Sequence, residues 1–478
     1  MTCAPRRTRF LPIAAGLAVM AAGGLTACGT STARQHPAAA PLEQTAEQVQ
    51  QAIATVWPRL GEIWPGADFS DHNLLLTDGR SVWEADRDHA TRVEEDKVRA
   101  EKIKLPQRGG FDVITWQGKH SLIVRVAQGK ELGQLRQDPL GLTSPSAAMH
   151  AFELATHEQF HPYVQNKDGK TWKSLAKLEA AGSGDREELY PLRAAPRIER
   201  AMIYNTLLDA AKDPGRAREL LTKTAWWRQK YQSDHREEAD SPKQVDLLEG
   251  TTKYVEQTAL SMALAGDRSG AGDLRKATLS RLKPMKTAFK GVEPYAIGTA
   301  ALLAADAQGK NLKTRLTQDP TTPLDALLEG VEPAPPQKVP DDVRQGVTAA
   351  VDKTNKQLAQ SIDPFVKAIQ DHGTRVLMLP VDKVSGSVGG SGFYTTEELP
   401  ISITPEARAT FSLPSGTMTL AGVTAGQMEQ DGTGYFAVPL SADAKVTSDR
   451  LTVKAKNLHG SIAVQAKDDD GQTFLYAR

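Results

Sequence analysis

The apolar positions between residues 42 and 126 change from a helical period to a strand period. From 42 to 56 an apolar residue recurs every three or four positions, which predicts a helix that stops at Pro58. Short apolar runs then flank Asp78-Gly79 and Gln117-Gly118, and each arrangement predicts a β-hairpin. The charged run 84–104 between the hairpins favours a solvated helix or a loop.

The pattern from 145 to about 373 is mainly helical, with short breaks. One break falls near Asp213-Pro214-Gly215 and another is the proline-rich connection 332–340. A polar segment, 232–243, precedes the stretch that contains Glu249. The expected helices include 198–208, 216–231, 245–256 and 343–372.

After residue 375 the pattern changes to short alternating runs separated by Gly, Asp and Pro. The expected strands are 375–380, 409–413, 434–440, 451–455, 461–465 and 473–476. The Gly/Ser run 385–392 is interpreted as a linker or loop, because it lacks the Lys-Ser/Thr of a phosphate-binding loop. This region is expected to be an all-β domain, sandwich-like or a small barrel.

The N-terminus has the features of an export signal. A basic region that includes Arg6, Arg7 and Arg9 precedes an apolar run too short to span a membrane comfortably. Leu-Thr-Ala-Cys follows directly, with Cys28 at the cleavage position, and this resembles the lipobox of bacterial lipoproteins. The resemblance implies cleavage before Cys28 and lipidation of its sulfur, which would anchor the exported protein to a bacterial membrane, facing outside the cytoplasm.

These patterns together predict an α+β protein, with a helical region that begins with β-hairpins and a smaller β domain after it. The expected divisions are a signal peptide, a low-complexity tether, a main domain and an all-β domain, at 1–27, 28–41, 42–374 and 375–478.

Cysteine usage and charge limit the chemistry that is open to this chain. Cys3 and Cys28 are the only cysteines, so a mature exported chain has no internal disulfide and no cysteine-ligated metal. Any metal site must use histidine and carboxylate side chains. Lys+Arg and Asp+Glu are equal at 58 each, so no strong field favours nucleic acid as a partner.

The clearest candidate chemistry is His157-Glu-Gln-Phe-His161. Histidines four apart on a helix lie on one face, where both rings can reach one metal ion. Glu158 is then placed to deprotonate a metal-bound water, which is typical of a zinc site. Ser144 and Pro145 are expected to cap the helix and to occupy its first turn.

A catalytic zinc usually has three protein ligands, so a third is expected on a neighbouring helix. Glu249 and Glu256 lie two turns apart on one face of the stretch 247–256, and Gly250 allows a second helix to pack closely. A pair of solvated surface carboxylates is the alternative reading. Glu153, Asp246 and Glu256 are candidates to orient His157 from behind; His150 is expected to be a helix-surface residue.

The order HExxH, then Glu249-Gly250-x-x-x-Tyr254, then Tyr295-x-x-Gly298 resembles the gluzincin metallopeptidases, the thermolysin-like group that includes the aminopeptidase N family. The resemblance implies a zincin-like main domain that hydrolyses peptide bonds in a peptide or protein substrate through a zinc-bound water. It implies Zn²⁺ held by His157, His161 and Glu249, with Glu158 as general base and Tyr295 stabilising the oxyanion. A strand within 111–126 would pair with extended substrate.

Two features depart from those enzymes. Eighty-seven residues separate His161 from Glu249, so a helical hairpin at about 185–231 must be inserted between them. Glu187, Glu188 and Glu199 are therefore alternative ligands. The Gly-x-Met-Glu-Asn motif that binds a free amino terminus is absent from the sequence, so exopeptidase action is not implied. A non-catalytic binding or assembly lipoprotein, or a metal-free scaffold, remains the alternative function.

Overall fold

The computed structural model describes residues 42–478 except 104, 107–109, 136–137, 145, 184–186, 267–269, 288–290, 442–443, 448 and 470. The expected signal peptide, the tether, Cys28 and Pro145 lie outside the described residues. The chain forms two compact units, each described by itself below. One contains the described residues of Ala22–Asp185 and Ala195–Val347, and the other those of Arg186–Ala194 and Thr348–Arg478.

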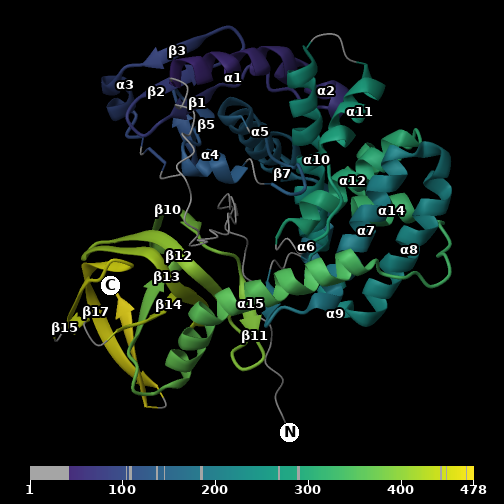
Figure 1. Ribbon diagram of the computed structural model, residues 1–478. Helices are drawn as coiled ribbons and strands as arrows, with labels where there is room; N and C mark the ends of the chain where they lie inside the picture. Colours follow the sequence, from purple (N-terminus) through teal and green to yellow (C-terminus); the bar gives the residue numbers. More distant parts are fainter. Residues whose placement is uncertain are drawn as a thin grey trace, which may run out of the picture. The chain divides into compact units, whose positions relative to one another are not determined.

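The first unit begins with a helix and a five-stranded mixed sheet (Figure 1). Helix α1 spans Leu42–Val56, and the sheet has the order β3-β2-β1-β5-β4. The strands are β1 (Leu74–Thr77), β2 (Val82–Ala85), β3 (Ala90–Val93), β4 (Phe111–Trp116) and β5 (Lys119–Arg125). The first helix and both hairpins, β1–β2 and β4–β5, are confirmed.

The charged run 84–104 is more structured than expected. It contains strand β3 and the short helix α3 (Glu95–Ala100), because the exposed residues of β3 still pair their backbone with β2. The expectation of a helix or loop alone was therefore wrong for this segment. The charged side chains show only that the segment is exposed to solvent. They do not show whether its backbone pairs with a neighbouring strand at the edge of a sheet.

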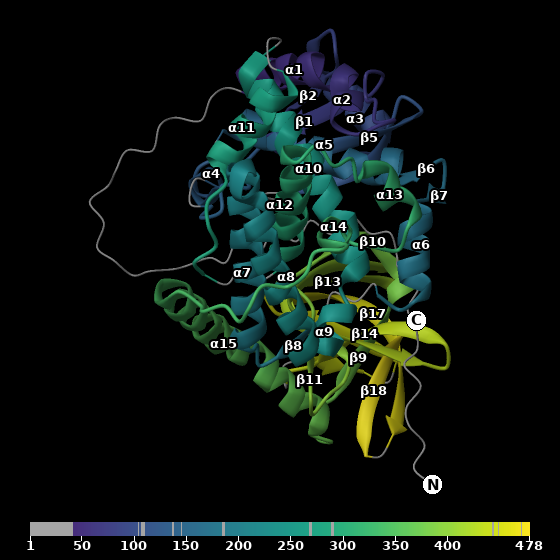
Figure 2. The same ribbon diagram turned by 90° about the vertical axis from the view of Figure 1, so that its right-hand side faces the viewer.

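The rest of this unit is mainly helical, and α10 (Lys243–Ala265) lies between α5 (Ala147–Phe160) and α12 (Glu293–Ala307), as Figure 2 shows. Fifteen of the 23 residues of α10 are buried, so it is the central helix of the unit. The remaining helices are α2 (Leu60–Ile63), α4 (Lys130–Leu135), α6 (Lys173–Ala180), α7 (Ala194–Lys212), α8 (Ala217–Asp234), α9 (Arg236–Asp240), α11 (Ala271–Arg281), α13 (Lys313–Gln318) and α14 (Pro323–Leu328).

Helices α7 and α8 form the helical hairpin that was expected between His161 and Glu249. They are joined by the short turn η3 (Pro214–Arg216), where the expected break falls. Thr224 donates a hydrogen bond to Thr206 across the buried interface of the two helices, at 2.9 Å. The inserted segment therefore packs as an ordered part of the same unit.

The second unit is built on a large, mostly antiparallel sheet. Its strands are β8 (Glu188–Tyr190), β9 (Val376–Pro380), β10 (Val384–Gly389), β11 (Tyr394–Thr396), β12 (Ser402–Leu413), β13 (Gly416–Gln430), β14 (Thr433–Pro439), β15 (Lys445–Val446), β16 (Arg450–Lys454), β17 (Leu458–Asp469) and β18 (Gln472–Ala477). Pairing runs from β17 through β18, β9, β14 and β13 back to β17, which closes a ring of five strands around an apolar core. Of the two architectures left open, the closed ring is the barrel-like one.

Helix α15 (Asp341–Gln370) covers the outer side of this sheet. Its apolar residues recur at three- and four-residue spacing and pack on Val376 and Met378 of β9; they are Leu358, Ile362, Phe365 and Ile369. The compact unit accordingly begins at Thr348, before the expected boundary at 375, and it includes β8, which pairs in parallel with β11. The α+β class is confirmed, but this unit is not purely β.

The Gly/Ser run 385–392 was expected to be a linker or loop, and this was wrong for residues 385–389. Residues Val384–Gly389 form β10, which pairs with β12 with an irregular register. Gly390 follows this strand, and a Cβ added there would clash with the Thr404 Cγ2 atom and lie 3.2 Å from the Pro405 carbonyl oxygen. Close packing against β12 therefore accounts for the glycine at position 390.

Candidate metal centre

Helix α5 carries the two histidines and begins later than the sequence suggested. Its N-cap is Ser146, whose hydroxyl accepts a hydrogen bond from the Met149 backbone N–H at 3.5 Å. The prediction that Ser144 caps this helix was therefore wrong, because Ser144 lies two residues before the N-cap. The regular helix ends at Phe160, and one π-helical turn, η2 (His161–Gln165), continues it through Pro162.

Helix α10 brings Glu249 to these histidines because it passes directly beside α5 and α12. At its crossing with α12, Gly250 faces Gly298, and an added Cβ on Gly250 would lie 2.8 Å from the Gly298 Cα. No larger residue fits there without moving a backbone. The two glycines thus set the short separation between the helix that carries Glu249 and the helix that carries Tyr295.

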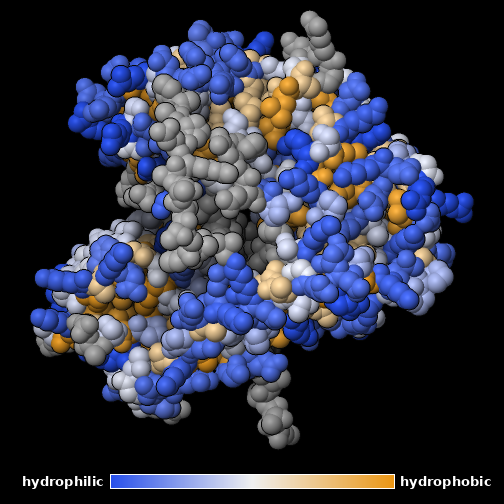
Figure 3. Space-filling view, in the orientation of Figure 1, coloured by the Kyte–Doolittle hydropathy of each residue, from blue (hydrophilic) through white to orange (hydrophobic). Residues whose placement is uncertain are grey.

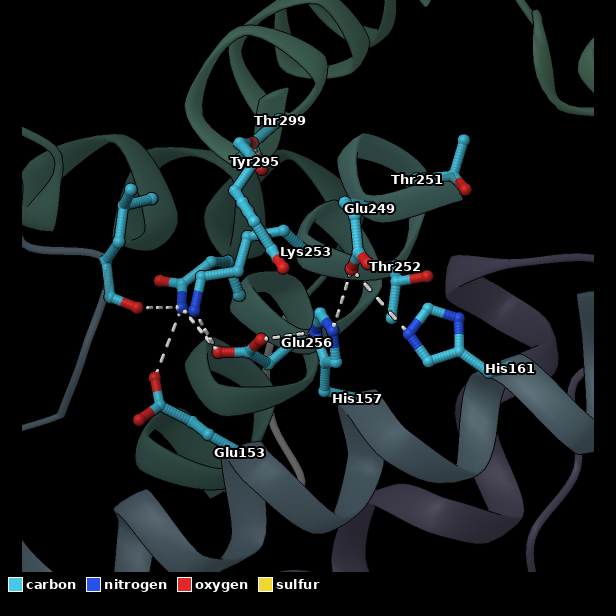
Figure 4. Close-up of polar contacts among 12 residues, drawn as sticks. Glu153, His157, His161, Glu249, Thr251, Thr252, Lys253, Glu256, Tyr295 and Thr299 are labelled. Atoms are coloured by element: carbon cyan, nitrogen blue, oxygen red, sulfur yellow. Dashed lines mark hydrogen bonds and ion pairs between the residues drawn. The ribbon is translucent and has the colours of Figure 1, made fainter. Parts of the chain in front are cut away.

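His157, His161 and Glu249 converge on one point, as Figure 4 shows. The Glu249 Oε2 atom lies 3.2 Å from His157 Nε2 and 3.7 Å from His161 Nε2. One ligand atom from each of the three residues lies within 4.8 Å of the other two, which is the geometry of a group that can hold a metal ion. His157 and Glu249 are buried and His161 is partly buried.

The far side of the His157 ring is held by a second carboxylate. Glu256 Oε2 lies 2.9 Å from His157 Nδ1, and Glu256 Oε1 accepts from Lys253 Nζ at 2.6 Å and from Gln257 Nε2 at 3.1 Å. Burial acts to raise the pKa of Glu256, but Lys253 and His157 outweigh it and lower this pKa. Glu256 therefore stays ionised and accepts a hydrogen bond from the ring nitrogen that points away from Glu249, as carboxylates that orient metal-bound histidines do.

The carboxylates around His157 favour a positive charge on or beside its ring. Burial acts to lower the pKa of its imidazole, but the contacts with Glu249 and Glu256 outweigh burial and raise the pKa to about 10. Three acidic groups, Glu158, Glu249 and Glu256, thus act on one buried ring. A cation at this point, either a proton or a metal ion, compensates the two buried carboxylates.

Tyr295 and Glu158 lie beside this group. The Tyr295 ring stacks on the His157 ring, with centroids 5.9 Å apart and planes at 26°. Figure 4 shows the Tyr295 side chain reaching from α12 toward His157 and Glu249. Glu158 follows His157 on α5, is partly exposed, and acts to raise the pKa of the His157 ring through its negative charge.

The other candidate residues have different partners. Glu153 accepts from the Ser144 N–H and from Gln257, and Asp246 pairs with Arg200, so neither contacts His157 as was considered. His150 is near Glu153, at 3.9 Å. Among the described residues, the alternative ligands Glu187, Glu188 and Glu199 do not join the group of three.

Two polar residues near the centre were not found from the sequence. Lys253 holds Glu256, and Gln165 holds His161, with Gln165 Oε1 2.6 Å from His161 Nδ1. Lys253 lies four residues after Glu249 and three before Glu256, a spacing that places it on the same helix face. The Gln165 side chain meets His161 because the π-helical turn places it there, and the sequence has no clear signal for such a turn.

Few large apolar side chains are exposed on the described part of the chain. Hydrophilic residues make up the larger part of the described surface seen in Figure 3, with smaller apolar groups between them. The large apolar side chains exposed in the described part of the chain are Val113, Leu189 and Leu264, which belong to β4, β8 and α10. Single exposed apolar residues are normal on protein surfaces. Within the described ranges, no helix combines the length and the apolar character needed to cross a membrane.

Comparison with known proteins adds no assignment: no family model, no curated protein and no solved structure matches this chain.

Proposed function

We propose that this chain is a zinc metallopeptidase, a hydrolase that cleaves peptide bonds at the centre formed by His157, His161 and Glu249. The observation that carries the proposal is the convergence of three lone-pair donors on one point, with both imidazoles held from behind by hydrogen bonds. A buried carboxylate such as Glu249 needs a donor or a cation, and two imidazole nitrogens that can bind a metal ion when neutral face the same point.

The donor set fits zinc. Both Nδ1 atoms are engaged by Glu256 and Gln165, so both Nε2 atoms face Glu249. Two imidazole nitrogens and one carboxylate form a set that zinc uses in hydrolytic enzymes, with one position left for substrate or water. With no cysteine among residues 29–478, softer thiolate chemistry is not available to this centre.

Bound zinc would supply a Lewis acid next to the scissile carbonyl and the attacking water. Glu158 supplies the base: its carboxylate takes a proton from the attacking water and gives it to the nitrogen of the leaving amine. The partial exposure of Glu158 suits this role, because a group that exchanges protons with substrate must reach it. Glu158 is therefore proposed as the general base and acid.

Tyr295 is proposed to stabilise the oxyanion. A phenol is a neutral donor at ordinary pH and can direct its O–H at the oxygen that gains charge in the transition state. The stacking of Tyr295 on His157 supports this role, since it keeps the phenol beside the ligand set. The Gly250–Gly298 contact supports it further by fixing α12 against α10.

The peptide substrate is proposed to bind along β4. Among the described residues this strand is at one edge of the five-stranded sheet, so an extended peptide can pair along that edge. Tyr163, two residues after His161, donates a hydrogen bond to the His120 carbonyl oxygen at 2.9 Å in the β4–β5 hairpin. That bond links the hairpin to the segment that follows the second ligand.

The location proposed for this activity is outside the cytoplasm, at a bacterial membrane. The support is the Leu-Thr-Ala-Cys sequence that ends at Cys28 directly after an apolar run. Lipid on Cys28 would then tether the enzyme through the segment 28–41.

A Glu158→Gln variant tests the proposed reaction. We expect the wild-type chain loaded with zinc to cleave members of a quenched fluorescent peptide library, and the variant to keep its zinc and lose cleavage by about a hundredfold or more. Glu47→Gln, at an exposed position of α1, is the matched control and is expected to match wild type. A wild-type chain that binds zinc but cleaves no peptide would favour the non-catalytic binding lipoprotein. Full activity in Glu158→Gln would contradict the assigned base.

A further inference from the structure

Gln165 makes three hydrogen bonds from a buried position between the two segments that carry ligands. Its side chain is on the last residue of the π-helical turn, and the residue is 1% exposed. Oε1 lies 2.6 Å from His161 Nδ1. Nε2 donates to the Leu248 carbonyl oxygen at 2.8 Å and to Thr251 Oγ1 at 2.9 Å.

The orientation of this amide follows from its partners. A backbone carbonyl such as that of Leu248 only accepts hydrogen bonds, so it must face the NH₂ end of Gln165. Thr251 Oγ1 gives its own proton to the Leu247 carbonyl oxygen and is therefore an acceptor for Gln165 as well. The oxygen end of the amide then faces His161, and only an Nδ1–H can donate to it.

We propose that Gln165 is a positioning residue that fixes the tautomer of His161 and joins the two ligand-bearing segments. With the proton on Nδ1, the lone pair of His161 Nε2 is directed at Glu249. The donor end of the same amide is tied to Leu248, the residue directly before Glu249. The Gln165 side chain therefore orients the His161 ring and also holds the backbone directly before Glu249. The part of this proposal that concerns zinc affinity rests on the proposed function.

The two histidines are thus held by different chemistry. His157 donates to the ionised Glu256, whereas His161 donates to a neutral amide. The neutral partner adds no charge beside a centre that already contains Glu249 and Glu256. Removing a partner of this kind typically weakens metal affinity by about 10- to 100-fold.

The test uses the purified full-length chain and three variants. Gln165→Met keeps similar volume but removes both the acceptor and the donors. Gln165→Glu restores an acceptor against Nδ1 and still lacks the donor toward Leu248. Gln159→Met is the matched control, because Gln159 is also buried and also has its Oε1 against a histidine, 2.7 Å from His72 Nδ1. Gln159 belongs to α5, the helix that the π-helical turn of Gln165 continues. His72 is not one of the three converging residues.

Two measurements are made on each protein. Imidazole nitrogen NMR of the metal-free chain reports the His161 tautomer, and competition with a chelator reports the dissociation constant for zinc. We expect the Nδ1–H tautomer in wild type, in Gln165→Glu and in Gln159→Met. Gln165→Met should populate both tautomers and bind zinc about 10- to 100-fold more weakly, with thermal unfolding showing that it is folded.

Two results would overturn the proposal: a His161 tautomer unchanged in Gln165→Met, or zinc affinity of folded Gln165→Met within twofold of wild type. If Gln165→Met does not fold, the comparison of Gln165→Glu with wild type decides, since loss of the Nδ1–H tautomer there contradicts the amide's role. A wild-type chain that binds no zinc would overturn the proposed function and the affinity part of this proposal. The metal-free spectra would still decide the tautomer.

Discussion

Gly250 and Gly298 are in backbone contact where α10 crosses α12, and this contact fixes the distance between Glu249 and Tyr295. Gly250 directly follows Glu249, and Gly298 is one helical turn after Tyr295. An added Cβ on Gly250 would lie 2.8 Å from the Gly298 Cα and 3.1 Å from the Pro294 carbonyl oxygen. The proposed metal ligand and the proposed oxyanion donor thus depend on two residues with no side chains.

Gly250→Ala is expected to separate α10 from α12. The methyl group must displace backbone atoms, which costs about 1–3 kcal/mol of stability, and Tyr295 moves away from the ligand set. Chemical denaturation and peptide cleavage measure the two effects. Gly272→Ala is the control, because an added Cβ at this position of α11 meets open space and alanine favours helix. Equal effects of the two substitutions would contradict the importance of the crossing.

Tyr295→Phe is expected to keep zinc and lose rate. Removal of one oxyanion donor lowers kcat by about 10²- to 10³-fold in comparable sites, with a smaller effect on KM. Tyr204→Phe, at another buried tyrosine whose hydroxyl donates to the Lys283 carbonyl oxygen, controls for loss of a buried hydroxyl. A Tyr295→Phe variant with unchanged kcat would remove Tyr295 from the mechanism.

Lys253→Met is expected to weaken the centre through Glu256. Loss of the cation leaves a buried carboxylate without its nearest positive charge, which raises the pKa of Glu256 and destabilises the fold by about 3 kcal/mol. Zinc affinity should fall, because Glu256 then holds His157 less firmly. Lys276→Met, at an exposed position of α11, is the control for loss of one positive charge. Wild-type affinity in Lys253→Met would show that Lys253 has no part in ordering the centre.

The metal-free protein is expected to lose stability as pH rises from about 6.5 to about 10. The pKa of His157 is raised from 6.5 to about 10 in the folded chain, so folding holds a proton that the unfolded chain releases in this interval. That contribution is complete below pH 6.5 and is lost as pH rises through 10. Urea unfolding with chelator at pH 6 and pH 9 measures it.

Histidine variants identify the source of this pH dependence. His157→Ala should reduce the slope, whereas His89→Ala, at an exposed position, should leave it intact. Zinc binding removes the proton from His157, so the zinc-loaded chain should become relatively more stable at the higher pH. A metal-free protein that gains stability between pH 6 and pH 9 through His157 would contradict this account of its electrostatics.

The part of the centre that local periodicity determines was predictable. His157 and His161 share a face because they are four residues apart on a helix, and Glu249 and Glu256 do so over two turns. The choice of Glu249 needed a family resemblance, because its approach to α5 depends on tertiary packing. The contact of Glu256 with His157 was one of three open alternatives, and packing alone decided among them.

Features that depend on distant backbone were not predictable. Strand β8 pairs with β11, about 200 residues later, and no local pattern encodes that partner. The glycine-rich β10 has no alternating apolar face, yet its backbone pairs with β12. Gln165 reaches His161 through a π-helical turn, which differs from an α-helical one by a small shift in hydrogen bonding.

The most direct test of the central claim is zinc content per chain, measured for the purified protein after zinc loading and for a Glu249→Ala variant. Glu199→Ala is the matched control, since Glu199 is equally buried but faces Lys230 and His235. We predict one zinc per chain in wild type and in Glu199→Ala, and a sharp reduction in Glu249→Ala. No zinc in wild type, or full zinc in Glu249→Ala, would contradict a centre built from His157, His161 and Glu249.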